Sequence, residues 1–182
     1  MSDRPLTRLP QNIDIHAHSG LPRADAVVCV DPVDSECLPE GSGWLSVGVH
    51  PWNADLADAA VWERMERWLT DPRVVAVGEV GLDALRGPEP GVQMTVLERQ
   101  IEMAGRHGLP LVIHCVRCFD KLLRLRKNRP TAGQWIVHGF RGKPALARQL
   151  LEAGIDLSFG DKYNPESYNI TPSERRYRET DR

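Results

Sequence analysis

Long apolar runs are missing from this sequence. No segment approaches the roughly 18 consecutive apolar residues that a membrane-spanning helix needs. Residues 1–11 lack the apolar centre of a secretory signal. We therefore expect a cytoplasmic protein that makes no use of a membrane.

An excess of one charge is missing as well. Lys and Arg number 23 and Asp and Glu number 25, which gives a net charge of −2 at pH 7. This balance excludes the basic surface that covers many nucleic-acid-binding domains. Any contact with DNA is therefore expected to be local.

Cysteine is scarce, with 4 residues at irregular spacing. This number and spacing do not suit the disulfide framework of a small secreted domain, so we expect mostly reduced thiols. Cys115 and Cys118 form a C-x-x-C motif between a predicted strand and a predicted helix. The motif leaves open a thiol redox pair or half of a zinc site.

Short apolar segments are what the sequence does contain. The 182 residues suffice for a single domain, 1–182, with a full hydrophobic core. Short runs rich in apolar and β-branched residues are typical of buried parallel strands. They lie at residues 13–16, 26–30, 45–49, 74–77, 111–114, 135–137, 156–159 and 176–180.

Amphipathic helices are predicted between several of these strands. Apolar side chains at 3.6-residue spacing indicate helices at 56–69, at 93–106, around 119–123 and from Pro144 to just before Gly154. This alternation predicts an α/β fold. The connections 17–25, 31–44 and 161–174 have too little helical pattern for a full helix.

Histidines and carboxylates follow the ends of these strands. The C-terminal ends of parallel strands converge on one face of an α/β fold, where ligands and catalytic groups collect. We therefore expect one polar bowl that contains His16, His18, His50, Glu79, His114, His138 and Asp181.

The residue types in this bowl suit a metal ion. His16 and His18 lie two residues apart, so a strand sends both imidazoles to the same side. Glu79 follows an apolar strand, where a buried carboxylate without a partner is costly. Imidazoles with a bridging carboxylate bind zinc, manganese and related ions. Each residue alone also fits an ordinary polar loop or a satisfied core position, but the group favours ligation.

Three residues in or next to the bowl are candidates for binding the substrate. His50 precedes a proline, which holds it extended at a strand end, and we expect it to contact the substrate. Arg141 and Lys143 are candidates for binding a phosphate or carboxylate, with solvated charges at a helix start as the alternative. His107, in the last turn of a predicted helix, is expected to be structural.

Six motifs in a fixed order give the sequence a family resemblance. It resembles the TatD-type metal-dependent hydrolases of the amidohydrolase-like superfamily, and especially their short bacterial relatives. The motifs are Ile15-His-Ala-His18, Val47-Gly-Val-His-Pro-Trp52, Gly78-Glu-Val-Gly-Leu-Asp83, Ile113-His-Cys115, Val137-His-Gly-Phe-Arg-Gly142 and Glu179-Thr-Asp181.

The resemblance implies a compact TIM-type (β/α) barrel with some outer helices shortened or missing. It also implies a centre of one or two divalent ions, which are zinc, magnesium, manganese or nickel. One ion would be bound by His16, His18, Glu79 and Asp181. The other would be bound by Glu79, as a bridge, with His114 and His138.

The activity that the resemblance implies is hydrolysis of phosphodiester bonds, often as a DNase. The substrate would be DNA or a small phosphodiester, attacked by a metal-activated water. Glu79, Asp181 and His50 are the expected catalytic residues, with Asp181 also accepting a proton. His50, Arg141 and Lys143 are the expected substrate-binding residues.

Alternatives remain open at this point. The same centre would also suit hydrolysis of a small amide or ester. Redox chemistry at Cys115 and Cys118 is a second alternative, and a metal-binding interaction module without turnover is a third. Helices are missing after the first and last predicted strands, so we expect an uncovered apolar seam. Self-association or further chain would bury it.

Overall fold

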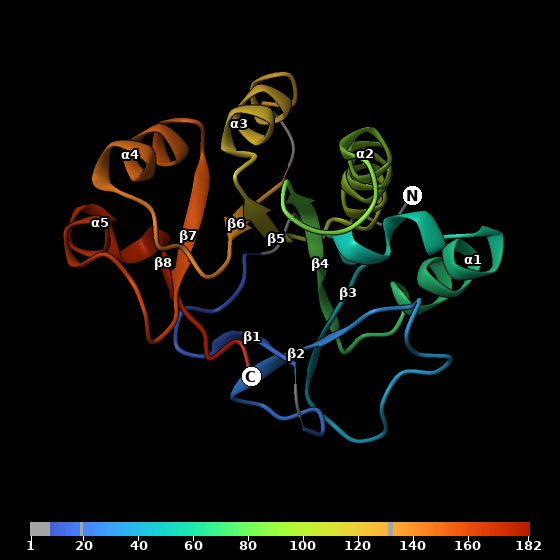
Figure 1. Cartoon of the computed structure of the whole chain (residues 1–182). Coiled ribbons are helices and arrows are strands. Elements are labelled where there is room, and N and C mark those ends of the chain that lie inside the picture. Colours follow the sequence, from blue (N-terminus) through green and yellow to red (C-terminus); the bar gives the residue numbers. More distant parts are fainter. Residues whose placement is uncertain (1–7, 19, 131–132) are drawn as a thin grey trace.

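The chain folds into a closed barrel of parallel strands (Figure 1). The computed structural model describes residues 8–18, 20–130 and 133–182. The strands pair in chain order, and the last strand closes the barrel by pairing with the first. They are β1 Asp14–Ala17, β2 Ala26–Val30, β3 Trp44–Val47, β4 Val74–Asp83, β5 Leu111–Val116, β6 Trp135–Val137, β7 Ile155–Phe159 and β8 Arg176–Arg178.

Helices lie outside the barrel and follow most of the later strands (Figure 1). They are α1 Ala59–Trp68, α2 Pro90–His107, α3 Phe119–Lys127, α4 Pro144–Glu152 and α5 Pro165–Ile170, with short 3-10 helices η1 Pro51–Leu56 and η2 Ser173–Arg175. Within the described residues, no helix lies between β1 and β2 or between β2 and β3. The predicted barrel with missing outer helices is confirmed. None of the helices in the described part of the chain is long and apolar enough to cross a membrane.

Two local expectations from the sequence were wrong. Strand β4 extends to Asp83, so Glu79 lies inside the strand and not after it, because β4 resumes pairing with β5 beyond a shift in register. The segment 161–174, expected to be irregular, contains α5. This helix depends on local capping, since the Asn164 side chain accepts a hydrogen bond of 3.0 Å from the Ser167 N–H.

The core has two layers, which follow from the alternation of side chains along each strand. One cluster fills the barrel interior with side chains from the strands, including Ile15, Val27 and Ile136. The other cluster joins the outer faces of the strands to the helices, and Met65 of α1 and Leu97 of α2 belong to it. The barrel is therefore a packed scaffold, and the polar site lies at one end of it.

The expected uncovered apolar seam is not found along β1 and β2 in the described part of the chain. Every residue of β1 is buried, and β2 is buried except for Cys29, which is half-buried. Val33 and Leu38, from the loop after β2, pack against the cluster that contains Val28 and Val30. The loop after β2 covers this strand in place of a helix. The structure therefore shows no exposed apolar surface along β1 and β2 that would favour self-association.

Asp156, at the start of β7, makes a buried polar network at the end of the barrel away from the site. One of its oxygens accepts from Arg8 Nη2 at 2.7 Å and from Gln134 Nε2 at 2.8 Å, and the other accepts from Arg175 Nε at 2.6 Å. Replacing Asp156 with Asn removes the charge that these guanidinium groups share.

We expect Asp156→Asn to lower the free energy of unfolding by about 2 to 3 kcal/mol, because it leaves Arg175 without its anion. Urea denaturation measures the change. Asp161→Asn is the matched control, since Asp161 pairs with Arg182 at the surface, and its effect should stay below about 1 kcal/mol. Equal effects of the two substitutions would contradict the buried network's role.

Candidate metal centre

Glu79 stands at the middle of the C-terminal mouth of the barrel. It comes from β4 and is 3% exposed. Its Oε1 lies 2.7 Å from His138 Nε2, 2.8 Å from His114 Nδ1 and 3.2 Å from His50 Nε2. One carboxylate oxygen thus faces three imidazoles that come from separate parts of the chain.

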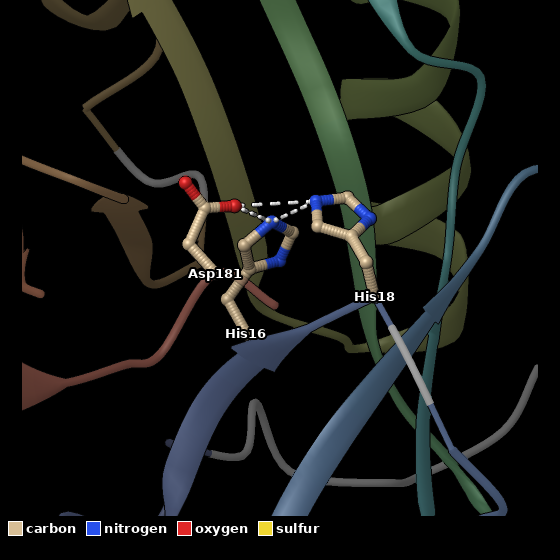
Figure 2. A group of neighbouring side chains, drawn as sticks. All are labelled: His16, His18 and Asp181. Carbon is tan, nitrogen blue, oxygen red and sulfur yellow. Dashed lines mark hydrogen bonds and ion pairs between the residues drawn. The ribbon is translucent and has the colours of Figure 1, made fainter.

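The other oxygen of Glu79 faces the first strand. Oε2 lies 3.1 Å from His16 Nε2 and 3.3 Å from His18 Nε2. Asp181 Oδ1 lies 3.6 Å and 3.3 Å from the same two nitrogens. Figure 2 shows both imidazoles and the Asp181 carboxylate pointing toward one another. The structure therefore brings all the residues of the predicted bowl together.

The end of the chain is tied to β1, and this places Asp181. The Asp181 N–H donates to the His16 carbonyl at 3.1 Å, and the His18 N–H donates to the Arg182 carbonyl at 2.8 Å. Asp14 accepts from the Thr180 hydroxyl at 2.6 Å. Asp181 has φ +53°, a left-handed conformation that Asp tolerates better than most residues. The backbone thus holds the carboxylate over the two histidines.

Gly81 lets β4 come close to β5 beside the site. A Cβ at this position would lie 1.9 Å from the His114 carbonyl oxygen, and its φ is +148°. Only glycine fits both conditions. Gly81 therefore fixes the approach of the strand that carries Glu79 to the strand that carries His114.

The electrostatics of the mouth are dominated by the charge of Glu79. Burial opposes this charge, but His138 and hydrogen bonds from His114, His138 and His16 lower the pKa of Glu79 overall. Hydrogen bonds with Asp181 and Glu79 raise the pKa of His18 to about 9. Burial opposes a charge on His138 too, yet Glu79 and Glu179 raise its pKa to about 10. Burial and the His138 charge lower the pKa of His16.

This donor set fits a divalent cation. His16 Nε2 and His18 Nε2 lie 3.1 Å apart and face the same carboxylate oxygen. A hydrogen bond between them uses the lone pair of one nitrogen only, whereas a cation accepts lone pairs from both. Two groups of side chains have possible ligand atoms close enough together to bind one ion. One is His16, His18 and Asp181, and the other is His50, Glu79 and His114.

Two carboxylates at the site, Glu179 and Asp83, were not among the predicted site residues. Glu179 is 5% exposed, and its Oε1 lies 3.5 Å from His138 Nδ1 while its other oxygen accepts from the Ser158 hydroxyl. Asp83 Oδ2 lies 3.2 Å from His114 Nε2. Each of these imidazoles therefore lies between Glu79 and an outer carboxylate, an arrangement that orients metal-binding histidines.

The sequence contained weak indications that these two carboxylates lie at the site. Glu179 lies two residues before Asp181 in the same motif, and Asp83 lies four residues after Glu79, on the same strand. Cys29 also contacts the site, but no sequence pattern indicated this, because its Sγ reaches Glu79 only through the position of β2 in the barrel. That sulfur accepts from the Glu79 N–H at 3.0 Å, and burial raises the pKa of its thiol to about 12.

The two basic residues that were predicted to bind substrate lie in different surroundings, and their role stays a prediction. Arg141 lines a cavity that reaches His138 and Asp181 at the mouth. Lys143 occupies the N-cap position of α4 and is not among the residues that line the mouth cavities, so its proximity to the site is not supported. His107 ends α2 and contacts Glu66 at 3.1 Å, as a structural residue should.

The thiol alternative gains no support from the structure. Burial raises the pKa of Cys115 to about 12 and also raises the pKa of Cys118. Reactive redox cysteines need the opposite shift, toward the thiolate. Cys115 lines a cavity at the barrel mouth, whereas Cys118 is buried in the apolar core.

Comparison with known proteins identifies the family. The family model described as TatD related DNase matches residues 37–182. The metal-dependent hydrolase YjjV of Escherichia coli (strain K12), described as uncharacterised, is 31% identical over 121 residues, which are 64% of this chain and 46% of that protein. The 3'-5' ssDNA/RNA exonuclease TatD of Erwinia billingiae is 33% identical over 119 residues, with the same shares.

Solved structures agree on the fold. The crystal structure of YjjV from Escherichia coli covers 93% of this chain with a TM-score of 0.76 and 24% identity, and 78% of that chain is covered. A TatD-family hydrolase from Entamoeba histolytica gives a TM-score of 0.72 with 20% identity, covering 96% of this chain and 75% of the other.

The fold defines the class, a TIM-type barrel with histidines and carboxylates gathered at its C-terminal mouth. The chain belongs to the TatD related DNase family. Its matches span less than half the length of these curated relatives.

Metal binding should release protons. His18, with a pKa of about 9, and His138, with a pKa of about 10, are protonated near neutral pH without metal. Ligation needs the neutral imidazole, so affinity should rise with pH toward these values. Calorimetric titration with Mn²⁺ or Zn²⁺ in two buffers of different ionisation enthalpy measures the release. His107→Gln should release the same number of protons. An identical enthalpy in both buffers would show that these groups are already neutral.

Proposed function

We propose that this chain is a metal-dependent phosphodiesterase that acts on DNA or a small phosphodiester. The convergence of four imidazoles on the buried Glu79 carboxylate, with Asp181 beside two of them, carries this proposal. Paired ions bridged by a carboxylate are typical of phosphodiester hydrolysis. The names of its nuclease relatives support the same substrate class.

The ligand sets that the family resemblance implies are compatible with the contacts at the mouth. His16, His18 and Asp181 would hold one ion with Glu79 Oε2. His114 and His138 would hold the other with Glu79 Oε1. Bound zinc, magnesium, manganese or nickel would supply Lewis acidity and lower the pKa of the attacking water.

The remaining residues supply positioning and proton transfer. Asp181 is 39% exposed at its side chain, and a hydrogen bond with His18 lowers its pKa, so it is an ionised base within reach of solvent. His50 borders a cavity of about 680 Å³ that also contains Glu79 and His114. Arg141 borders the adjoining cavity, where its guanidinium would meet a phosphate oxygen.

We also propose that the barrel is one hydrolase domain and that it acts in the cytoplasm. Hydrolysis of a small amide or ester would use the same ligands. No contact in the described structure favours it over phosphodiester hydrolysis.

Glu79→Gln should reduce turnover by about 100-fold or more, equal to about 2.7 kcal/mol in activation free energy. The substitution keeps the volume but removes the charge that would bridge the ions. Hydrolysis of single-stranded DNA with added Mn²⁺, before and after chelation, measures the effect, and circular dichroism checks the fold. Glu98→Gln, on the outer face of α2, is the control. Undiminished chelator-sensitive turnover in the Glu79 variant would refute the bridging role.

A further inference from the structure

Trp52 is a large aromatic residue exposed beside the candidate metal centre. It is the second residue of η1 and follows His50 in the same motif. Its exposed fraction is 41%, and it lines the same cavity as His50, Glu79 and His114. Exposed aromatic surface in a cavity is typical of a binding site.

The indole is held rigidly with respect to the metal ligands. Trp52 Nε1 donates to Asp83 Oδ2 at 2.8 Å, and the same oxygen lies 3.2 Å from His114 Nε2. The His50 ring stands edge-on to the indole, with 4.7 Å between ring centroids. A side chain fixed in this way loses little conformational entropy when it binds a ligand.

A positive charge lies against this ring. The Arg86 guanidinium carbon is 4.8 Å from the centre of the Trp52 ring. Among the residues that the structure describes, no carboxylate forms an ion pair with this guanidinium. Guanidinium groups stack on aromatic rings and also bind phosphate. The Arg86 guanidinium therefore lies over one face of the indole, so that an aromatic ring at the cavity carries a phosphate-binding charge stacked on it.

We propose that Trp52 and Arg86 form a stacking platform for one nucleobase of a single-stranded nucleic acid, next to the reacting phosphodiester. The inference rests on the proposed function and adds to its site a residue pair that binds a base. Bases in a duplex already stack on one another, whereas the bases of a single strand are free to stack on an aromatic side chain.

Binding measured without hydrolysis tests the platform. The probes are a fluorescein-labelled oligothymidine and an abasic oligomer of equal length, both in the presence of chelator. Trp52→Leu should weaken oligothymidine binding by roughly 5- to 150-fold, the range for loss of one base–aromatic stack, and leave the abasic oligomer unchanged. Trp44→Leu is the matched control, because Trp44 is 39% exposed but lies at the start of β3, at the other end of the barrel.

Tryptophan fluorescence gives a second readout with conservative variants. Oligothymidine should quench the emission of the unmodified protein and of Trp44→Phe, and the quenching should disappear in Trp52→Phe, whose ring still fills the site. Quenching that survives in Trp52→Phe would overturn the proposal. An equal loss of affinity for both oligomers in Trp52→Leu, or no preference of the unmodified protein for oligothymidine, would overturn it too.

The outcomes also separate this inference from the proposed function. Base-dependent binding through Trp52 without chelator-sensitive hydrolysis would support the platform and refute the phosphodiesterase. Chelator-sensitive hydrolysis of DNA with equal binding of both oligomers would support the phosphodiesterase and refute the platform.

Discussion

The charge of Glu79 is the constraint on which the mouth of this barrel depends. A carboxylate that is 3% exposed is costly unless its charge is compensated. Imidazoles from β1, β5 and the end of β6 surround it at hydrogen-bond distance. In the absence of metal, protons on His18 and His138 balance the charge, and divalent ions would take their place.

The barrel closure explains how residues so far apart in sequence meet around one carboxylate. Pairing of β8 with β1 brings Asp181 over His16, and Asp14 fastens the two chain segments together. Outer carboxylates then hold the imidazoles in place, as Asp83 does for His114. Because Asp83 also accepts from Trp52, the exposed rim of the cavity is linked to His114 in its interior. A shift of the Asp83 side chain would disturb the candidate metal centre and the rim together.

Much of this arrangement can be predicted from the sequence, because the C-terminal ends of parallel strands meet on one face and bring together the side chains that follow the apolar runs. The missing outer helices near β1 and β2 and the meeting of His16, Glu79 and Asp181 follow from that pattern, whereas the closed barrel was implied by the family resemblance.

Other features depend on contacts that no local pattern encodes. The extension of β4 to Asp83 depends on its pairing with β5. The burial of β2 depends on Val33 and Leu38 from a loop without periodicity. Cys29 reaches Glu79 only because β2 stands near β4 in the closed barrel.

The location of bound metal tests the central claim most directly. Anomalous diffraction from crystals grown with Mn²⁺ or Zn²⁺ should show at least one ion at about 2.0 to 2.3 Å from a Glu79 oxygen and from histidine nitrogens of the mouth. A second ion, if bound, should lie on the other oxygen of the same carboxylate. Ions found only elsewhere, for example at Cys115 and Cys118, with none at Glu79, would contradict the claim that this carboxylate organises a metal centre.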